Sequence, residues 1–198
     1  MNRYDFLLVC GQRTGSHFLG TCLASHPGIC MHGEIGRKDP ILPNNIEPKP
    51  GQITGAILMY TNFKRLEKGI VETGKVIHLV RDPDYVGRSR IRNSKLKKMG
   101  IIKAHVFNSK NIPQLPKIDK SISKQVSRHY LNKSNEISEW LMNHRDIFIL
   151  TVAYEWLTCG KPEVIKIEHR KAEYILNFLG LKYSPLTTEL RATGYGKE

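Results

Sequence analysis

The segment LLVCGQRTGSHFLG places a glycine-rich turn between an apolar run and a helical pattern. Gly15 and the start of the following helix would present backbone N–H groups that form a cradle for an anion. Arg13 adds a planar cationic fork that suits phosphate or sulfate oxygens. A kinase-type phosphate loop reads G-x-x-x-x-G-K and then Ser or Thr, whereas this turn has a shorter glycine spacing and no lysine. The turn therefore predicts an anion site of another kind, with a purely structural turn as the alternative.

A second cationic segment, VRDPDYVGRS, places Arg81 after an apolar run and Ser89 eight positions later. Two turns of helix would carry Ser89 back beside the strand end, where both side chains would hold one phosphate. The same residues also suit a structural role, in which Arg81 forms an ion pair and Asp82 caps the helix. This segment alone leaves both interpretations open.

The net charge of +13 is concentrated in one part of the chain. Residues 61–135 contain 18 Lys and Arg against 5 Asp and Glu, so the remainder is balanced. Such a segment attracts nucleotides, nucleic acid, acidic glycans or anionic lipid without choosing among them, and a solvated surface is the alternative. A basic nucleic-acid-binding protein and a P-loop-type nucleotide kinase remain candidates. Against them, the segment lacks a recognition motif, and the chain lacks the kinase lysine.

Apolar runs and helical periodicities alternate along the chain, which indicates a three-layer α/β, P-loop-like fold with a mainly parallel central sheet. We expect one domain over residues 1–198 and ligands at the carboxyl ends of the strands. A proline-rich excursion at 36–52 and a loop at 100–118 would wall the site. The expected strands are Tyr4–Cys10, Lys75–Val80 and Asp146–Val152; the expected helices are Ser16–Ser25, Thr54–Leu66, Asp82–Lys98, Ser121–His144 and Arg170–Leu179.

The composition indicates a soluble, cytoplasmic protein without a structural metal. The apolar run at the N-terminus is too short to span a membrane, and no signal-peptide cleavage pattern follows it. The four cysteines have no C-x-x-C spacing, so we expect reduced thiols. The eight histidines are scattered and suggest no zinc site.

Taken together, the two cationic segments resemble those of sulfotransferases that use 3′-phosphoadenosine 5′-phosphosulfate (PAPS). QRTGSHFLGTCLASHPG is similar to the 5′-phosphosulfate-binding loop and helix of that family, and VRDPDYVGRS to its 3′-phosphate-binding segment. HGE at 32–34, FILTVAYEWL at 148–157 and NFLGL at 177–181 extend the likeness. The Gln-Arg-Thr-Gly-Ser form of the loop is closest to bacterial trehalose-type and carbohydrate sulfotransferases.

The resemblance implies transfer of a sulfuryl group from PAPS to a hydroxyl acceptor by in-line displacement, with 3′-phosphoadenosine 5′-phosphate (PAP) as the product and no metal. The acceptor is a small molecule or a carbohydrate, and an inactive relative that only binds the donor is an alternative. Glu34 is the candidate base, with His26 and His32 as alternatives, and Arg13 stabilises the leaving group. The donor would be held by Arg13, Thr14, Gly15, Ser16, His17, Arg81 and Ser89. At His17, relatives often carry a small hydroxyl residue.

Overall fold

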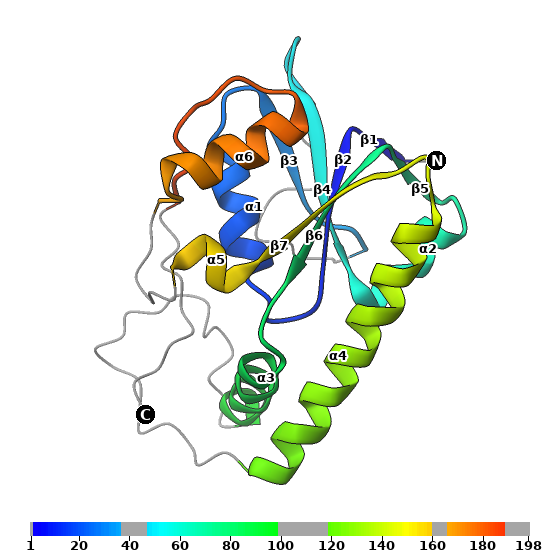
Figure 1. Cartoon of the computed structure of the whole chain (residues 1–198), viewed down its shortest axis with the longest axis vertical. Coiled ribbons are helices and arrows are strands. Elements are labelled where there is room, and N and C mark those ends of the chain that lie inside the picture. Colours follow the sequence, from blue (N-terminus) through cyan, green and yellow to red (C-terminus); the bar gives the residue numbers. More distant parts are fainter. Residues whose placement is uncertain (1, 37–46, 99–118, 160–165, 189–198) are drawn as a thin grey trace.

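Five parallel strands form the central sheet of the computed structural model, which describes residues 2–36, 47–98, 119–159 and 166–188 (Figure 1). Their spatial order is β3-β4-β2-β6-β7. A separate pair, β1 (Asn2–Tyr4) and β5 (Val71–Thr73), is also parallel. The strands of the main sheet are β2 (Phe6–Cys10), β3 (Ile29–Glu34), β4 (Ile53–Met59), β6 (Lys75–Val80) and β7 (Phe148–Ala153).

Helices cover both faces of this sheet (Figure 1). One face carries α1 (Ser16–Ala24), α5 (Tyr154–Thr158) and α6 (His169–Leu179). The other carries the 3-10 turn Tyr60–Asn62, α2 (Lys64–Glu67) and α4 (Lys120–Asn143), and α3 (Pro83–Lys98) packs against α4. The predicted α/β architecture with three layers is confirmed.

The central strand β2 is apolar throughout because both of its faces are covered. Phe6, Leu8 and Cys10 belong to the core beneath α1 and α6, whereas Leu7 and Val9 belong to the core beneath α4. This alternation explains why the sequence FLLVC contains no polar position.

The connections that follow β2 and β6 lead to opposite edges of the sheet, to β3 and to β7, and this defines where a ligand would bind. Helix α1 leads from β2 to the edge strand β3, while β6 lies on the other side of β2. In open parallel sheets, ligands bind outside the carboxyl ends of the strands at such a switch point. The loop after β2 and the beginning of α3 after β6 lie close together at this end of the sheet (Figure 1).

The segment 54–66, which the sequence predicts to be a helix, instead forms all of β4 after Ile53, the 3-10 turn Tyr60–Asn62 and most of α2. A short apolar run such as ITGAILM fits a buried strand as well as a helix, and only its long-range partners decide. Here β4 pairs with β2 over Gly55–Met59, and the missing side chain of Gly55 leaves room for the ring of Phe6.

The other expected strands and helices are present within a few residues of their predicted ends. The predicted loop 100–118 and most of the excursion 36–52 lie outside the described residues. All four cysteines are free thiols, three of them buried. Among the described residues, no helix combines the length and the apolar character needed to cross a bilayer.

A buried polar network joins β6 to α4. His78 in β6 is 1% exposed, and its Nε2 lies 2.7 Å from the hydroxyl of Tyr60. The Tyr60 hydroxyl also lies 3.1 Å from Ser134 Oγ, and Ser138 Oγ lies 3.4 Å from His78 Nδ1. Burial lowers the pKa of His78 from 6.5 to about 4, so the imidazole is neutral in the folded protein.

This shift predicts a pH dependence of folding. Between pH 6.5 and 4 the unfolded chain takes up a proton at His78 that the folded chain does not, so stability falls as the pH falls through this window. The total loss is on the order of 3 kcal/mol, from about 1.4 kcal/mol per pKa unit. Chemical denaturation at several pH values gives the free energy of unfolding of both proteins. As the pH is lowered, that of the wild type should fall by this amount more than that of His78→Gln. Equal pH profiles for the two proteins would contradict the buried neutral imidazole.

Candidate functional site

The loop between β2 and α1 is a tight turn that is held by the side chain of one of its residues, Thr14. Thr14 is fully buried, and its hydroxyl donates a hydrogen bond of 2.8 Å to the carbonyl oxygen of Gly11. Arg13 has a φ of 70°, a left-handed conformation that is unusual for a residue other than glycine. Ser16 begins α1 directly afterwards, so the N–H groups of the first helical turn are oriented as an anion cradle.

Gly15 is required at its position for two reasons. Its φ of 97° lies in the region that favours glycine, and a Cβ there would lie 2.2 Å from the ring of Tyr154. Tyr154 is the first residue of α5, immediately after β7. Its ring packs against the loop on the face of the sheet that also carries α1. The glycine of the motif thus reflects a close approach as well as a turn.

Arg81 lies at the carboxyl end of β6 with its side chain only 3% exposed. Its Nη1 donates a hydrogen bond of 3.0 Å to the carbonyl oxygen of Arg13. Its Nε lies 3.5 Å from a carboxylate oxygen of Glu155, and its guanidinium carbon lies 4.4 Å from the centre of the Tyr154 ring. Arg81 is therefore fixed against the anion loop.

Ser89 reaches the same place from α3. Arg13 Nε donates a hydrogen bond of 3.0 Å to its hydroxyl oxygen, so Ser89, in the second turn of α3, lies beside Arg13 of the loop. Burial, and then the nearby Arg81 cation, lower the pKa of Arg13. Two guanidinium groups thus lie together in a partly buried site, where a bound anion would offset their repulsion.

Asp82 and Glu155 have structural roles at this junction. Asp82 Oδ1 accepts hydrogen bonds from the N–H groups of Asp84 and Tyr85, at 2.8 and 3.3 Å, and thereby caps α3. Both carboxylate oxygens of Glu155 lie 3.4 Å from the N–H of Asp82. The structural interpretation of the Arg-Asp-Pro turn is therefore correct, and the same turn also holds Arg81 beside the loop.

Glu34 and His17 form a second polar group at this end of the sheet. Glu34 ends β3, and its Oε1 lies 2.8 Å from Nε2 of His17 in the first turn of α1. A β-bulge makes this contact possible: Met31 pairs with Gly55 and Glu34 with Ile57, so β3 has one residue more than β4 over this interval. Without it, Glu34 would share the face of His32.

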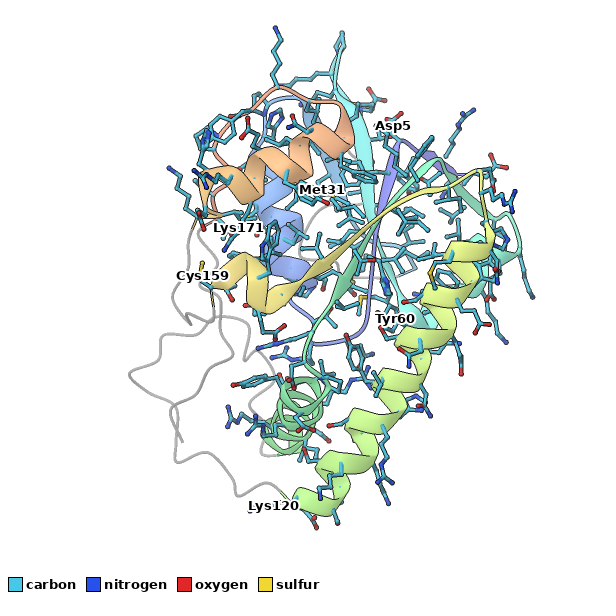
Figure 2. The ribbon with its side chains drawn as sticks, in the orientation of Figure 1. Asp5, Met31, Tyr60, Lys120, Cys159 and Lys171 are labelled. Atoms are coloured by element: carbon cyan, nitrogen blue, oxygen red, sulfur yellow. The ribbon has the colours of Figure 1, made fainter. Side chains whose placement is uncertain are left out.

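The alternative bases are placed elsewhere. His26 follows the far end of α1, where its Nε2 lies 3.0 Å from the carbonyl oxygen of Lys182 and its Nδ1 accepts from the N–H of Gly28. His32 packs its ring against Tyr4, on the face of β3 opposite to Met31, which points towards α1 and α6 (Figure 2). Of the three candidate bases, Glu34 is the one whose carboxylate lies 2.8 Å from His17, in the first turn of the helix after the loop.

One residue that the sequence does not single out as part of the site is Tyr130 in α4. Its hydroxyl accepts a hydrogen bond of 2.9 Å from the N–H of Arg81, and a Cβ on Gly11 would lie 2.7 Å from its ring. Its ring stacks on that of Tyr60, which lies between the sheet and α4 (Figure 2). Tyr130 thereby touches both segments of the site, and helical periodicity alone predicts only that it is buried.

The structure thus brings the predicted site residues to one end of the sheet. Arg13, Arg81 and Ser89 form one connected group, and the backbone turn of Thr14, Gly15 and Ser16 links it to the pair His17 and Glu34. Within the described residues, no cluster of three His, Cys, Asp or Glu side chains suits a metal ion. No family model and no curated protein matches this chain.

The Tyr130 contact predicts a measurable cost. Tyr130→Phe keeps the ring but leaves the buried N–H of Arg81 without this acceptor, so the free energy of unfolding should fall by about 1–3 kcal/mol. Tyr174→Phe is the matched control, because Tyr174 is 57% exposed and the change should stay within about 0.5 kcal/mol. Urea denaturation measures both, and equal effects would contradict the role assigned to the Tyr130 hydroxyl.

Proposed function

We propose that this protein is a sulfotransferase that binds PAPS and passes its sulfuryl group to a hydroxyl acceptor, with a carbohydrate among the candidates. The observation that carries the proposal is the junction of Arg13, Arg81 and Ser89 beside a left-handed, glycine-containing turn. The cationic groups of this junction come from the ends of two separate strands, β2 and β6. This arrangement suits a ligand with two anionic ends better than one with a single phosphate chain.

In this proposal the two ends of the donor bind to different segments. The loop of Arg13 to Ser16 and the first turn of α1 hold the 5′-phosphosulfate, because backbone N–H groups and a guanidinium both favour its oxygens. Arg81 and Ser89 hold the 3′-phosphate. A nucleotide kinase is less well supported, since Ser16 and not a lysine follows Gly15. The Asp82 carboxylate, which follows a strand as a magnesium-binding aspartate would, caps α3 instead.

The proposed reaction needs no covalent enzyme intermediate. The acceptor oxygen attacks the sulfur as the bond between sulfur and the bridging oxygen of the 5′-phosphate breaks, and PAP leaves with the electron pair. Arg13 and the loop N–H groups stabilise the charge that develops on the departing phosphate. Glu34 takes the acceptor proton as the new S–O bond forms. We place the reaction in the cytoplasm, in keeping with four free thiols.

Nucleotide choice tests the donor site. PAP should raise the melting temperature much more than AMP or ATP with magnesium, because only PAP fills both anion positions. Arg81→Ala should weaken PAP binding by about 1.5–3 kcal/mol, the scale of hydrogen bonds to a charged group.

Calorimetric titration gives the PAP affinities, and Arg128→Ala is the matched control because Arg128 is an exposed arginine of the same basic segment. An equal loss in Arg128→Ala would assign binding to the general field of that segment. Equal stabilisation by ATP would favour the kinase, and PAP binding without any transfer would indicate an inactive relative.

Glu34→Gln tests the base. The amide keeps the size of the side chain and loses its basicity, so turnover of labelled PAPS with an accepted sugar, glycolipid or phenol should fall by about 10²- to 10⁴-fold. PAP affinity should stay nearly constant, because the carboxylate is not needed to hold the donor. Turnover of Glu34→Gln close to that of the wild type would remove Glu34 from the mechanism, and a large loss in His32→Asn alone would transfer the role to that imidazole.

A further inference from the structure

We propose that His17 is a positioning residue for Glu34, an inference that rests on the proposed sulfotransferase function. In this role the imidazole holds the carboxylate at the opening of the donor loop and does not itself bind the phosphosulfate. The resemblance of the loop to known donor sites implies only that His17 helps to bind the donor. The geometry of the His17 side chain points the other way, towards β3.

The contact joins α1 and β3, two elements whose apolar side chains also share the core on this face of the sheet. His17 Nε2 and Glu34 Oε1 are 2.8 Å apart, and the two side chains are 22% and 13% exposed. The partner is available only because the bulge between Met31 and Glu34 turns the carboxylate to the face of α1. Strand irregularities of this kind are frequent beside active sites, where they redirect a side chain.

The pairing has a chemical use. A base must present one oxygen to the acceptor hydroxyl within hydrogen-bond reach and along a fixed direction. A glutamate side chain has several rotamers, and a hydrogen bond from Nε2 of His17 restricts those of Glu34. His17 lies one residue after Ser16, which begins the helix, so its ring fixes the carboxylate relative to the backbone that would hold the sulfuryl group. The acceptor proton ends on Glu34, and the imidazole keeps its own protons.

Double-mutant analysis separates this role from direct donor binding. The probe is sulfur-35-labelled PAPS with water as the acceptor, assayed for His17→Ala, Glu34→Gln and the double variant. His17→Ala should lower sulfate release by about 10- to 100-fold, the scale of a misplaced reacting group. PAP affinity should stay within about twofold of the wild type. The double variant should be as slow as Glu34→Gln alone, because His17 acts only through Glu34.

Two further variants distinguish positioning from simple loss of structure. His17→Gln keeps an N–H donor and should recover part of the rate lost in His17→Ala. His32 lies on the same strand as Glu34 but on the opposite face. The rate of sulfate release by His32→Asn should therefore match that of the wild type. In nitrogen-15 spectra of the histidine rings, Glu34→Gln should shift the Nε2 resonance of His17 without any ligand.

Independent, multiplicative losses in the double variant, together with weaker PAP binding by His17→Ala, would overturn the inference and assign His17 to the donor. An unchanged Nε2 resonance in Glu34→Gln would overturn it as well. These results differ from failure of the proposed function itself, in which the wild-type protein would neither bind PAP nor release sulfate from PAPS.

Discussion

The hydrogen bond from the guanidinium of Arg81 to the carbonyl oxygen of Arg13 is the contact on which the candidate site depends. It joins the ends of β2 and β6, the two strands at the switch point of the sheet. It also brings one buried cation against the backbone of another cationic residue. Burial of such charges is unfavourable unless partners offset it. The fold supplies Glu155, the face of Tyr154 and the left-handed turn at Arg13 for this purpose.

The elements around this contact show how a rigid framework maintains an unfavourable arrangement. Tyr154 packs on Gly15 and under Arg81, while Tyr130 packs on Gly11 and accepts from the N–H of Arg81. The two aromatic residues come from helices on opposite faces of the sheet. A buried cationic site that is held from both sides is prepared for an anion, and little reorganisation is needed on binding. This preorganisation is the physical basis of the proposed PAPS site.

Much of this arrangement could be predicted from local sequence. The turn at 11–16, the helix that carries Ser89, and the apolar strand patterns are short-range features, and the structure contains them where the sequence indicates them. The wrong helix over 54–66 and the geometry behind Glu34 and Tyr130 both depend on long-range pairing. The run ITGAILM becomes β4 because it pairs with β2, and Glu34 faces α1 because β3 gains a bulge against β4. Tyr130 joins the site through a helix more than a hundred residues along the chain from the loop, which no local pattern indicates.

In the proposed sulfotransferase, the loop and the Arg81 segment form one site with two anion positions. Phosphorus NMR of PAP tests this most directly, because the 3′- and 5′-phosphates give separate signals. We expect both signals to shift together as wild-type protein is added, and Arg81→Ala to reduce the shift of the 3′-phosphate in particular. A shift of the 5′-phosphate alone, or of neither signal, would contradict it.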